Sequence, residues 1–139
     1  KHADTGQAAV IDYKTGRHVS HRGWFDERVT EPQLPLYCVA DGTPASAALL
    51  ARVRADAPGC RFVGLSRDEG FADGVETAEQ VAGLDWGHTV AHWQRALATL
   101  AAEVVDGRAD PTPSPETCEY CPLGPLCRVA ELTGEAADD

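Results

Sequence analysis

Neither a long apolar run nor an excess of basic residues is found in this 139-residue sequence, and it contains no methionine. Because a transmembrane helix needs about 20 consecutive apolar residues, we expect no membrane span and a cytoplasmic location. The first residue, Lys1, belongs to a polar turn, so we expect the chain to be part of a longer protein. The hydrophobic content of 43% is enough for one globular domain with a modest core.

Positive charge is scarce overall, since the formal net charge is −10. Non-specific affinity for nucleic acid comes mainly from Lys and Arg, so such a chain is not expected to bind DNA strongly by itself. The charge is unevenly distributed, because residues 110–139 hold seven acids and one arginine, whereas residues 1–30 hold five Lys or Arg and four acids. The candidate DNA-binding residues in the more basic segment are Arg17, Arg22 and Arg28.

Apolar patterning in the first half of the chain predicts a mixed α/β fold. Residues 7–13 have the length and composition of a strand, which we interpret as the second strand of a hairpin. A proline begins a predicted helix at residues 32–39. A second helix is predicted at residues 43–57, with a Thr-Pro start and a Pro-Gly stop, and residues 60–66 are predicted to form another strand.

The second half of the chain is less regular. Residues 67–87 lack clean periodicity and are predicted to form a loop with one short strand. Apolar residues recur every three or four positions from residue 89 to residue 106, which predicts an amphipathic helix. Its core-facing positions are expected to be Val90, Trp93, Leu97, Leu100 and Val104. Residues 110–115 form an extended, Pro-rich linker.

An acid and a lysine stand at the end of the first predicted strand. Alternate side chains of a strand share a face, so Asp12 and Lys14 are expected to project together. A carboxylate can hold Mg²⁺ or Mn²⁺, which polarises a scissile phosphate and activates water, while a lysine orients the nucleophile or stabilises developing charge. This pair is therefore a candidate for phosphodiester hydrolysis. Taken alone, Asp-x-Lys also fits a surface ion pair that closes a hairpin.

Gln33 and Tyr37 follow at helical i,i+4 spacing, which places both side chains on one helix face. Residues Asp12–Gly16 (DYKTG) and Gln33–Tyr37 (QLPLY) resemble the signature of the RecB-type branch of the PD-(D/E)XK nucleases. The resemblance implies a restriction-endonuclease-like α/β core, a mixed sheet flanked by helices, of which this chain holds the C-terminal portion. It also implies that Gln33 and Tyr37 contact DNA or order the catalytic groups, although Tyr37 could instead be a core aromatic residue.

Three of the five cysteines, Cys118, Cys121 and Cys127, lie within ten residues. Thiolates at such spacing converge on a soft metal or cluster, and the spacing alone suggests zinc about as readily as iron–sulfur. The run resembles the C-x2-C-x5-C ending of AddB-like and CRISPR-adaptation nucleases, which implies ligands of a [4Fe–4S] cluster. The separate cysteines Cys38 and Cys60 are expected to be buried small hydrophobes.

Two parts of the family pattern are missing from the sequence. A second acidic metal ligand is expected on the strand before Asp12, and a fourth cluster cysteine is expected upstream of the nuclease core. We therefore expect these residues to be inactive by themselves and to bind Mg²⁺ weakly. An uncovered strand edge at residues 7–13 is expected to recruit a second copy, most simply as a dimer.

We expect three segments: residues 1–109 as part of the nuclease core, 110–130 as linker and cluster-binding segment, and 131–139 as an acidic, disordered tail. The resemblance also implies a Mg²⁺-dependent exodeoxyribonuclease of DNA repair and recombination, with DNA as substrate and a helicase or nuclease partner. The alternative is a catalytically inactive module that holds DNA or a partner. A zinc-binding interaction domain, in which Asp-x-Lys is coincidental, ranks behind both.

Overall fold

The computed structural model describes residues 4–16, 18–40, 45–55, 59–114, 118–119 and 121–128. Arg17 and the expected acidic tail at 131–139 lie outside the described residues. The chain divides into two compact units, Lys1–Ala102 and Glu103–Asp139. Among the helices of the described residues, none combines the length and the apolar character needed to cross a bilayer.

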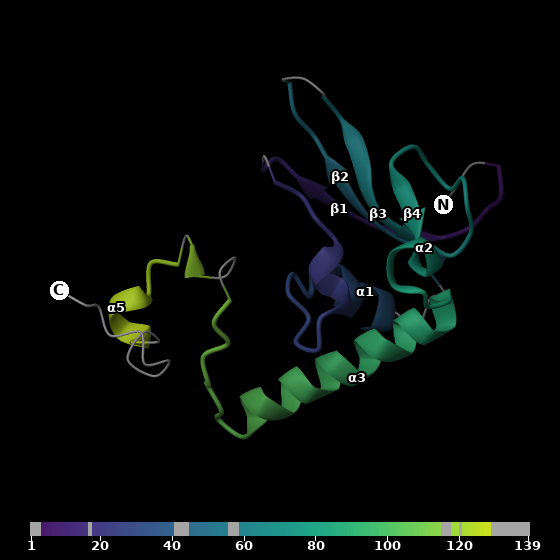
Figure 1. The fold of residues 1–139 in the computed structure, drawn as a ribbon. Coiled ribbons are helices and arrows are strands. Elements are labelled where there is room, and N and C mark those ends of the chain that lie inside the picture. The colour runs from purple at the N-terminus through teal and green to yellow at the C-terminus, as the bar shows by residue number, and fades with distance from the viewer. Residues whose placement is uncertain are drawn as a thin grey trace. The chain divides into compact units, whose positions relative to one another are not determined.

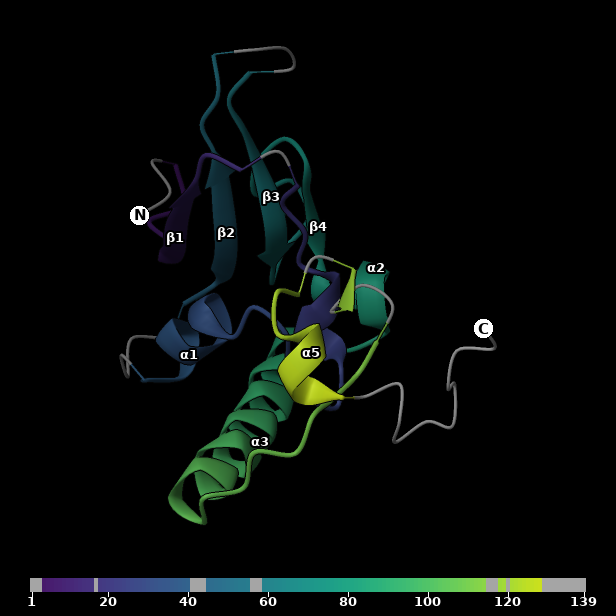
Figure 2. The ribbon, with the colours of Figure 1, turned by 90° about the vertical axis from the view of Figure 1, so that its left-hand side faces the viewer.

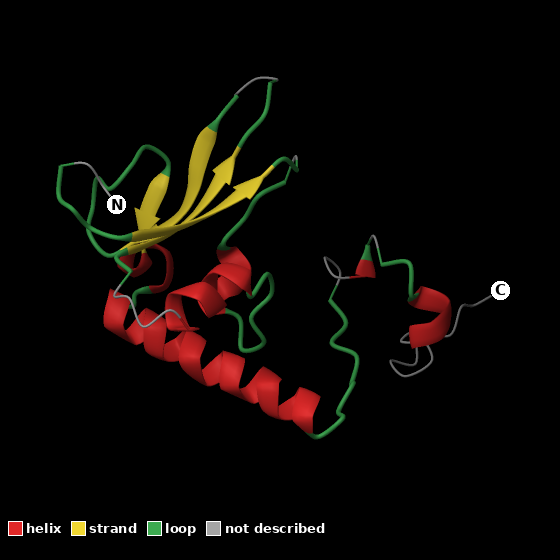
Figure 3. Cartoon of the chain, turned by 180° about the vertical axis from the view of Figure 1, so that it is seen from behind, coloured by secondary structure: helices red, strands yellow, loops and turns green. Residues whose placement is uncertain are grey.

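The first unit is built on a four-stranded sheet in the order β1-β2-β3-β4 (Figure 1). Its strands are β1 Ala9–Lys14, β2 Ala47–Arg52, β3 Arg61–Ser66 and β4 Val75–Thr77. The β1–β2 and β3–β4 pairs are parallel and the β2–β3 pair is antiparallel. The predicted mixed sheet flanked by helices is therefore confirmed, as are the strands expected at residues 7–13 and 60–66 (Figure 3).

The helix expected at residues 43–57 was predicted wrongly, because β2 occupies its centre at Ala47–Arg52. Its Ala- and Leu-rich sequence favours a helix locally. Every residue of β2 is nevertheless buried, and the strand is hydrogen-bonded to a neighbour on each side. Burial on both faces accounts for the absence of the polar alternation that marks a half-exposed strand. The expected Thr-Pro start lies at residues outside the described ranges.

One face of the sheet carries the main core. It is covered by the 3₁₀ helix η1 Arg22–Phe25, by α1 Gln33–Ala40 and by α3 Trp86–Val105 (Figure 2). The buried cluster consists of Trp24, Val29, Leu34, Cys38, Ala48, Leu50, Leu65, Trp93 and Ala96. Trp93 is at its centre, since its ring meets Trp24 edge-on at 6.0 Å and its Nε1 donates to the Trp24 carbonyl at 3.0 Å. The helix predicted at residues 32–39 is confirmed as α1.

The predicted amphipathic helix is confirmed as α3, which begins earlier than expected, at Trp86. Its first turn is capped by Asp85, whose carboxylate accepts from the His88 backbone N–H at 2.8 Å and whose pKa is lowered chiefly by that hydrogen bond. The expected core position Val104 was predicted wrongly, because its side chain is 78% exposed. Core packing along α3 reaches only to Leu97.

The segment predicted as a loop contains a short helix that the periodicity missed. After the expected short strand, β4, the chain enters α2 Ala78–Ala82. Thr77 and Gln80 form a reciprocal capping box there, and Gly83 ends the helix in the left-handed conformation. The Thr-x-x-Gln spacing is a known start signal, but five residues are too few to show helical periodicity.

The other face of the sheet is only partly covered. Ala47 and Leu49 pack there against Phe71 from the loop before β4. Nearer the end of β1, Ile11 and Tyr13 are 41% and 72% exposed. These odd-numbered side chains alternate with the less exposed Val10, Asp12 and Lys14, as a strand with two different faces requires.

Candidate active site

Asp12 and Lys14 project from the core side of β1, at the end of the strand. Their side chains are 19% and 31% exposed, and Lys14 Nζ lies 3.0 Å from Asp12 Oδ2. The expected common face is therefore confirmed by the geometry. Lys14 also lies 3.8 Å from the carboxylate of Glu31, which is 70% exposed.

Gln33, at the start of α1, bridges the acid and the lysine. Its Nε2 donates to Asp12 Oδ1 at 3.4 Å, and its Oε1 accepts from Lys14 Nζ at 3.4 Å. The same Nε2 donates to the Tyr37 hydroxyl at 3.3 Å, one helical turn further along. Only a side chain with both donor and acceptor ends can serve these three partners at once.

The structure thus brings together all four residues that the two sequence motifs singled out, Asp12, Lys14, Gln33 and Tyr37. Two come from a strand and two from a helix that contacts it. Tyr37 is 46% exposed, so the interpretation of this residue as a core aromatic is wrong. Its hydroxyl accepts from Gln33 and keeps its own proton for another acceptor.

The electrostatics of the pair decide what Lys14 can do. The pKa of Lys14 is raised, chiefly by its charge-assisted contact with the Asp12 carboxylate, against the lowering effect of partial burial. A lysine of raised pKa stays protonated at neutral pH and cannot serve as a general base. It can donate hydrogen bonds and stabilise negative charge.

Asp12 Oδ2 retains an unused lone pair. This oxygen is buried and has no hydrogen bond of good geometry within the described residues, although Lys14 Nζ lies 3.0 Å away. Coulomb attraction depends on the distance between the charges and not on the hydrogen-bond angle, so this contact is an ion pair. The oxygen can still accept a further cation. A hard, oxygen-seeking divalent ion fits this donor.

One carboxylate does not complete a metal site. In the parts of the chain that the structure describes, no group of three His, Cys, Asp or Glu side chains is placed to hold a metal ion. The network at β1 therefore supplies one acidic ligand for Mg²⁺ or Mn²⁺, as the sequence predicts. Full coordination would need carboxylates from elsewhere.

Glu31 is a neighbour that sequence reasoning missed. Glu31 has a left-handed backbone conformation, with a φ of 54°, which is uncommon for a residue other than glycine. It immediately precedes Pro32 and α1. A proline disfavours helical geometry in the residue before it, which was the available signal that the chain bends here. The bend directs the Glu31 carboxylate towards Lys14.

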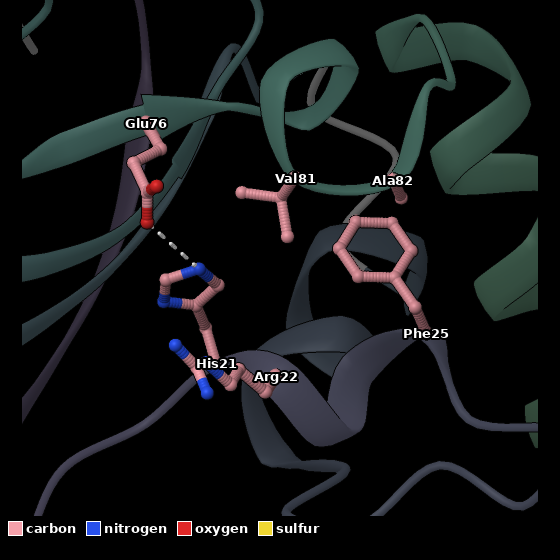
Figure 4. A pocket seen from close by; sticks show the side chains of 6 residues that line it. All are labelled: His21, Arg22, Phe25, Glu76, Val81 and Ala82. Atoms are coloured by element: carbon pink, nitrogen blue, oxygen red, sulfur yellow. Dashed lines mark ion pairs between the residues drawn. The ribbon is translucent and has the colours of Figure 1, made fainter.

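Of the predicted DNA-binding arginines, Arg22 lies away from β1. It lines a pocket of about 540 Å³ with His21, Phe25, Glu76, Val81 and Ala82 (Figure 4). Glu76 belongs to β4, at the opposite edge of the sheet from β1. The sheet order therefore separates Arg22 from Asp12. Arg28 lies within the described residues and interacts with another group of the protein. Arg17 lies outside the described residues.

The two separate cysteines differ. Cys38 is buried in the main core, and burial raises the pKa of its thiol to about 12, so the expected small hydrophobe is confirmed there. Cys60 was predicted wrongly, because it is exposed at the residue before β3. A position just outside a strand does not share the burial of the strand.

The second unit holds Cys118, Cys121 and Cys127 as free, exposed thiols. Cys127 is the last residue of the short helix α5 Gly124–Cys127, and its N–H donates to the Leu123 carbonyl at 2.8 Å. The Cys121 N–H donates to the Cys118 carbonyl at 3.2 Å, so the backbones of these two cysteines are in contact. Their role as metal ligands stays a prediction.

Comparison with known proteins gives one match. A family model described as the PD-(D/E)XK nuclease superfamily covers residues 2–128, which include both motifs and the cysteine run. Neither the curated proteins nor the solved structures contain a match to this chain.

Proposed function

Since this chain belongs to the PD-(D/E)XK nuclease superfamily, we propose that it forms part of the catalytic domain of a metal-dependent nuclease that hydrolyses DNA phosphodiesters. The observation that carries this proposal is the hydrogen-bonded network of Asp12, Lys14, Gln33 and Tyr37. An ordinary surface ion pair needs no third residue to hold it, whereas here one amide fixes both partners.

Each residue of the network has a distinct task in this mechanism. Asp12 offers Oδ2 to a divalent cation, which when bound polarises the phosphate and lowers the pKa of water. Lys14, kept protonated by Asp12, donates to the attacking water or to a phosphate oxygen that gains charge. Gln33 holds the two at fixed separation, and the Tyr37 hydroxyl is left with a proton to donate to substrate.

The finer form of the proposal is an exodeoxyribonuclease of DNA repair and recombination that works with a helicase or nuclease partner. It is supported by the resemblance of the two motifs to the RecB-type branch. The chemistry requires a further carboxylate beside Asp12, so we expect activity only in protein that supplies one. A catalytically inactive module that holds DNA or a partner is the second candidate, favoured by the single acidic ligand in the described site.

We propose further that Cys118, Cys121 and Cys127 are ligands of a [4Fe–4S] cluster. Their exposure as free thiols leaves them available to a metal, and their spacing resembles that of AddB-like nucleases. Iron and sulfide content with visible absorbance, measured on anaerobically purified protein, would test this. Stoichiometric zinc without iron would contradict it.

Self-association is the last part of the proposal. β1 is an edge strand of the described sheet, and its outward face presents Ile11 and Tyr13. Exposed strand edges with apolar side chains recruit another chain. We expect these 139 residues to form a dimer, which light scattering would detect. A monomer at all concentrations tested would contradict this expectation.

The deciding experiment compares two Asp→Asn substitutions in the intact protein. Asp12→Asn keeps the shape of the side chain but removes the charge that would hold the metal, so cleavage of labelled DNA in Mg²⁺ should be abolished. Asp106→Asn is the matched control, because Asp106 is exposed beyond α3 and should leave the rate unchanged. Cleavage by Asp12→Asn at the wild-type rate would contradict the assignment. If the wild-type protein binds DNA tightly but cleaves it with none of the divalent ions tested, the inactive module is favoured.

A further inference from the structure

Three basic residues form one row across the sheet, next to the network at β1. In the strand register Lys14 pairs with Arg52, and Arg52 pairs with Arg61. Residues paired in register on neighbouring strands place their side chains on the same face. The row therefore lies on the face that bears Asp12, at the end of the strands where Lys14 stands.

The middle member of the row is unusual. Arg52 is only 6% exposed, and its Nε is buried with no hydrogen-bond partner among the described residues. Ion pairs in the described part of the chain include neither Arg52 nor Arg61. A buried guanidinium without a counter-charge is costly, and like charges directly opposite on neighbouring strands repel each other. An external anion would relieve both costs.

The rest of the chain makes the row stand out. The net charge is −10, with 12 Lys and Arg in all, yet three of the basic residues are aligned here. Lys14 is part-exposed and Arg61 is exposed, so both ends of the row are open to solvent. A local line of positive charge in an acidic protein concentrates anionic ligands at that line.

The dimensions fit a nucleic-acid strand. Neighbouring strands lie about 4.8 Å apart, so the row from Lys14 to Arg61 is about 10 Å long. Phosphates of one DNA strand advance about 3.4 Å per nucleotide along the helix axis and lie farther apart than this along the strand itself, so a row of this length spans about two phosphates. Guanidinium groups bind phosphate oxygens in a bidentate manner, which suits Arg better than Lys at the two positions beyond Lys14.

We propose that Lys14, Arg52 and Arg61 form a track for the phosphate backbone of DNA that leads to the Asp12 carboxylate. The track replaces Arg22, which lies at the other edge of the sheet, as the basic surface of the site. This inference rests on the proposed nuclease function for its ligand. It adds that the exposed Arg61 holds the strand through its backbone, without reading its sequence, and that the buried Arg52 adds positive charge to the same line.

The test separates binding from cleavage by using the Asp12→Asn protein, which should hold DNA without cutting it. Affinity for a short fluorescein-labelled DNA is measured by anisotropy over a range of salt concentrations. Arg61→Gln in this background should weaken binding several-fold and reduce the slope of log K against log salt by about one, equally for DNA of different sequence. Arg52→Gln should weaken binding in the same direction but by less, because the Arg52 side chain is buried.

Two controls keep the result interpretable. Arg95→Gln removes an exposed arginine from α3, and should change neither affinity nor slope. Arg52→Lys keeps the charge but not the bidentate fork, and should lie between wild type and Arg52→Gln. Should Arg52→Gln fail to fold, as judged by its melting curve, Arg61→Gln decides alone.

The outcomes distinguish the two proposals. Unchanged affinity and slope in Arg61→Gln, or an equal loss in Arg95→Gln, would overturn the track while leaving the nuclease proposal standing. If binding depends on Arg61 but the protein never cleaves DNA, the nuclease proposal is overturned and the phosphate track is retained. Absence of DNA binding by the intact protein even at low salt would overturn both.

Discussion

The two edges of the sheet carry acid and base groups on the same face, but they are built differently. At β1, Asp12 and Lys14 are part-exposed and are linked by hydrogen bonds to Gln33. At β4, the His21 side chain is 8% exposed and its ring pairs with Glu76 (Figure 4), with 3.4 Å between His21 Nε2 and Glu76 Oε2. The β1 edge is an open network, whereas at the β4 edge a buried histidine meets a carboxylate that is 58% exposed.

The difference shows what each edge is suited to. At β1 the Lys14 side chain is 31% exposed and is held in position, so an incoming phosphate can reach its charge. At β4 burial lowers the pKa of His21, outweighing the raising effect of the Glu76 carboxylate, and Arg22 lowers it further. Its Nδ1 is buried without a partner in the described residues. A buried histidine with a lowered pKa is better suited to a structural role than to catalysis.

The largest expected effect comes from the support that both edges share. Trp93 is fully buried and contacts both Trp86 and Trp24, and Trp24 lies two residues after Arg22. Trp93→Ala should lower the free energy of unfolding by about 3–5 kcal/mol, because it leaves a large cavity. Chemical denaturation measures this loss. Val104→Ala, at an exposed position of the same helix, should change stability by less than about 0.5 kcal/mol, and similar losses in both variants would contradict the position of the core.

The next effect should be confined to the β1 edge. Gln33→Leu removes both ends of the bridge between Asp12 and Lys14, and supporting contacts of this kind are worth about 10- to 100-fold in metal affinity or activity. We expect kcat to fall by that factor with little change in the melting temperature. Gln33→Glu should be no better, because its carboxylate cannot donate to Asp12. Wild-type kcat in Gln33→Leu would show that the bridge is incidental.

A smaller effect should separate the edges by pH. The folded-state pKa of His21 is below its unfolded value near 6.5, so the unfolded state binds the proton more readily. Stability should therefore fall as the pH drops below about 6.5 and level off below the lowered pKa. His21→Leu should flatten this dependence. Urea midpoints measured across that range test it, and the same slope in wild type and His21→Leu would mean that another group is responsible.

The smallest effect is expected at Glu31. Its ion pair with Lys14 is long and its side chain is 70% exposed, so Glu31→Gln should change stability by less than about 0.5 kcal/mol. DNA cleavage should also stay near the wild-type rate, because Asp12 and Gln33 still hold Lys14. A large loss of cleavage would instead place Glu31 within the site at the β1 edge.

Local patterns in the sequence determined several parts of this protein. The alternation along residues 9–14 placed Asp12 and Lys14 on one face, because strand side chains alternate regardless of context. The spacing of Gln33 and Tyr37 placed them one helical turn apart, and apolar periodicity located α3. Each of these features follows from backbone geometry over a few residues and does not depend on contacts with distant parts of the chain.

Tertiary structure decided the rest. Ala47–Arg52 has a sequence that favours a helix, and it is a strand because neighbours on both sides complete its hydrogen bonds and bury both its faces. The bridge from Gln33 to Asp12, the row from Lys14 to Arg61 and the pair of His21 with Glu76 all join residues far apart in the chain. Such contacts depend on strand order and register, which arise when the whole sheet packs against its helices and not from any short stretch of sequence.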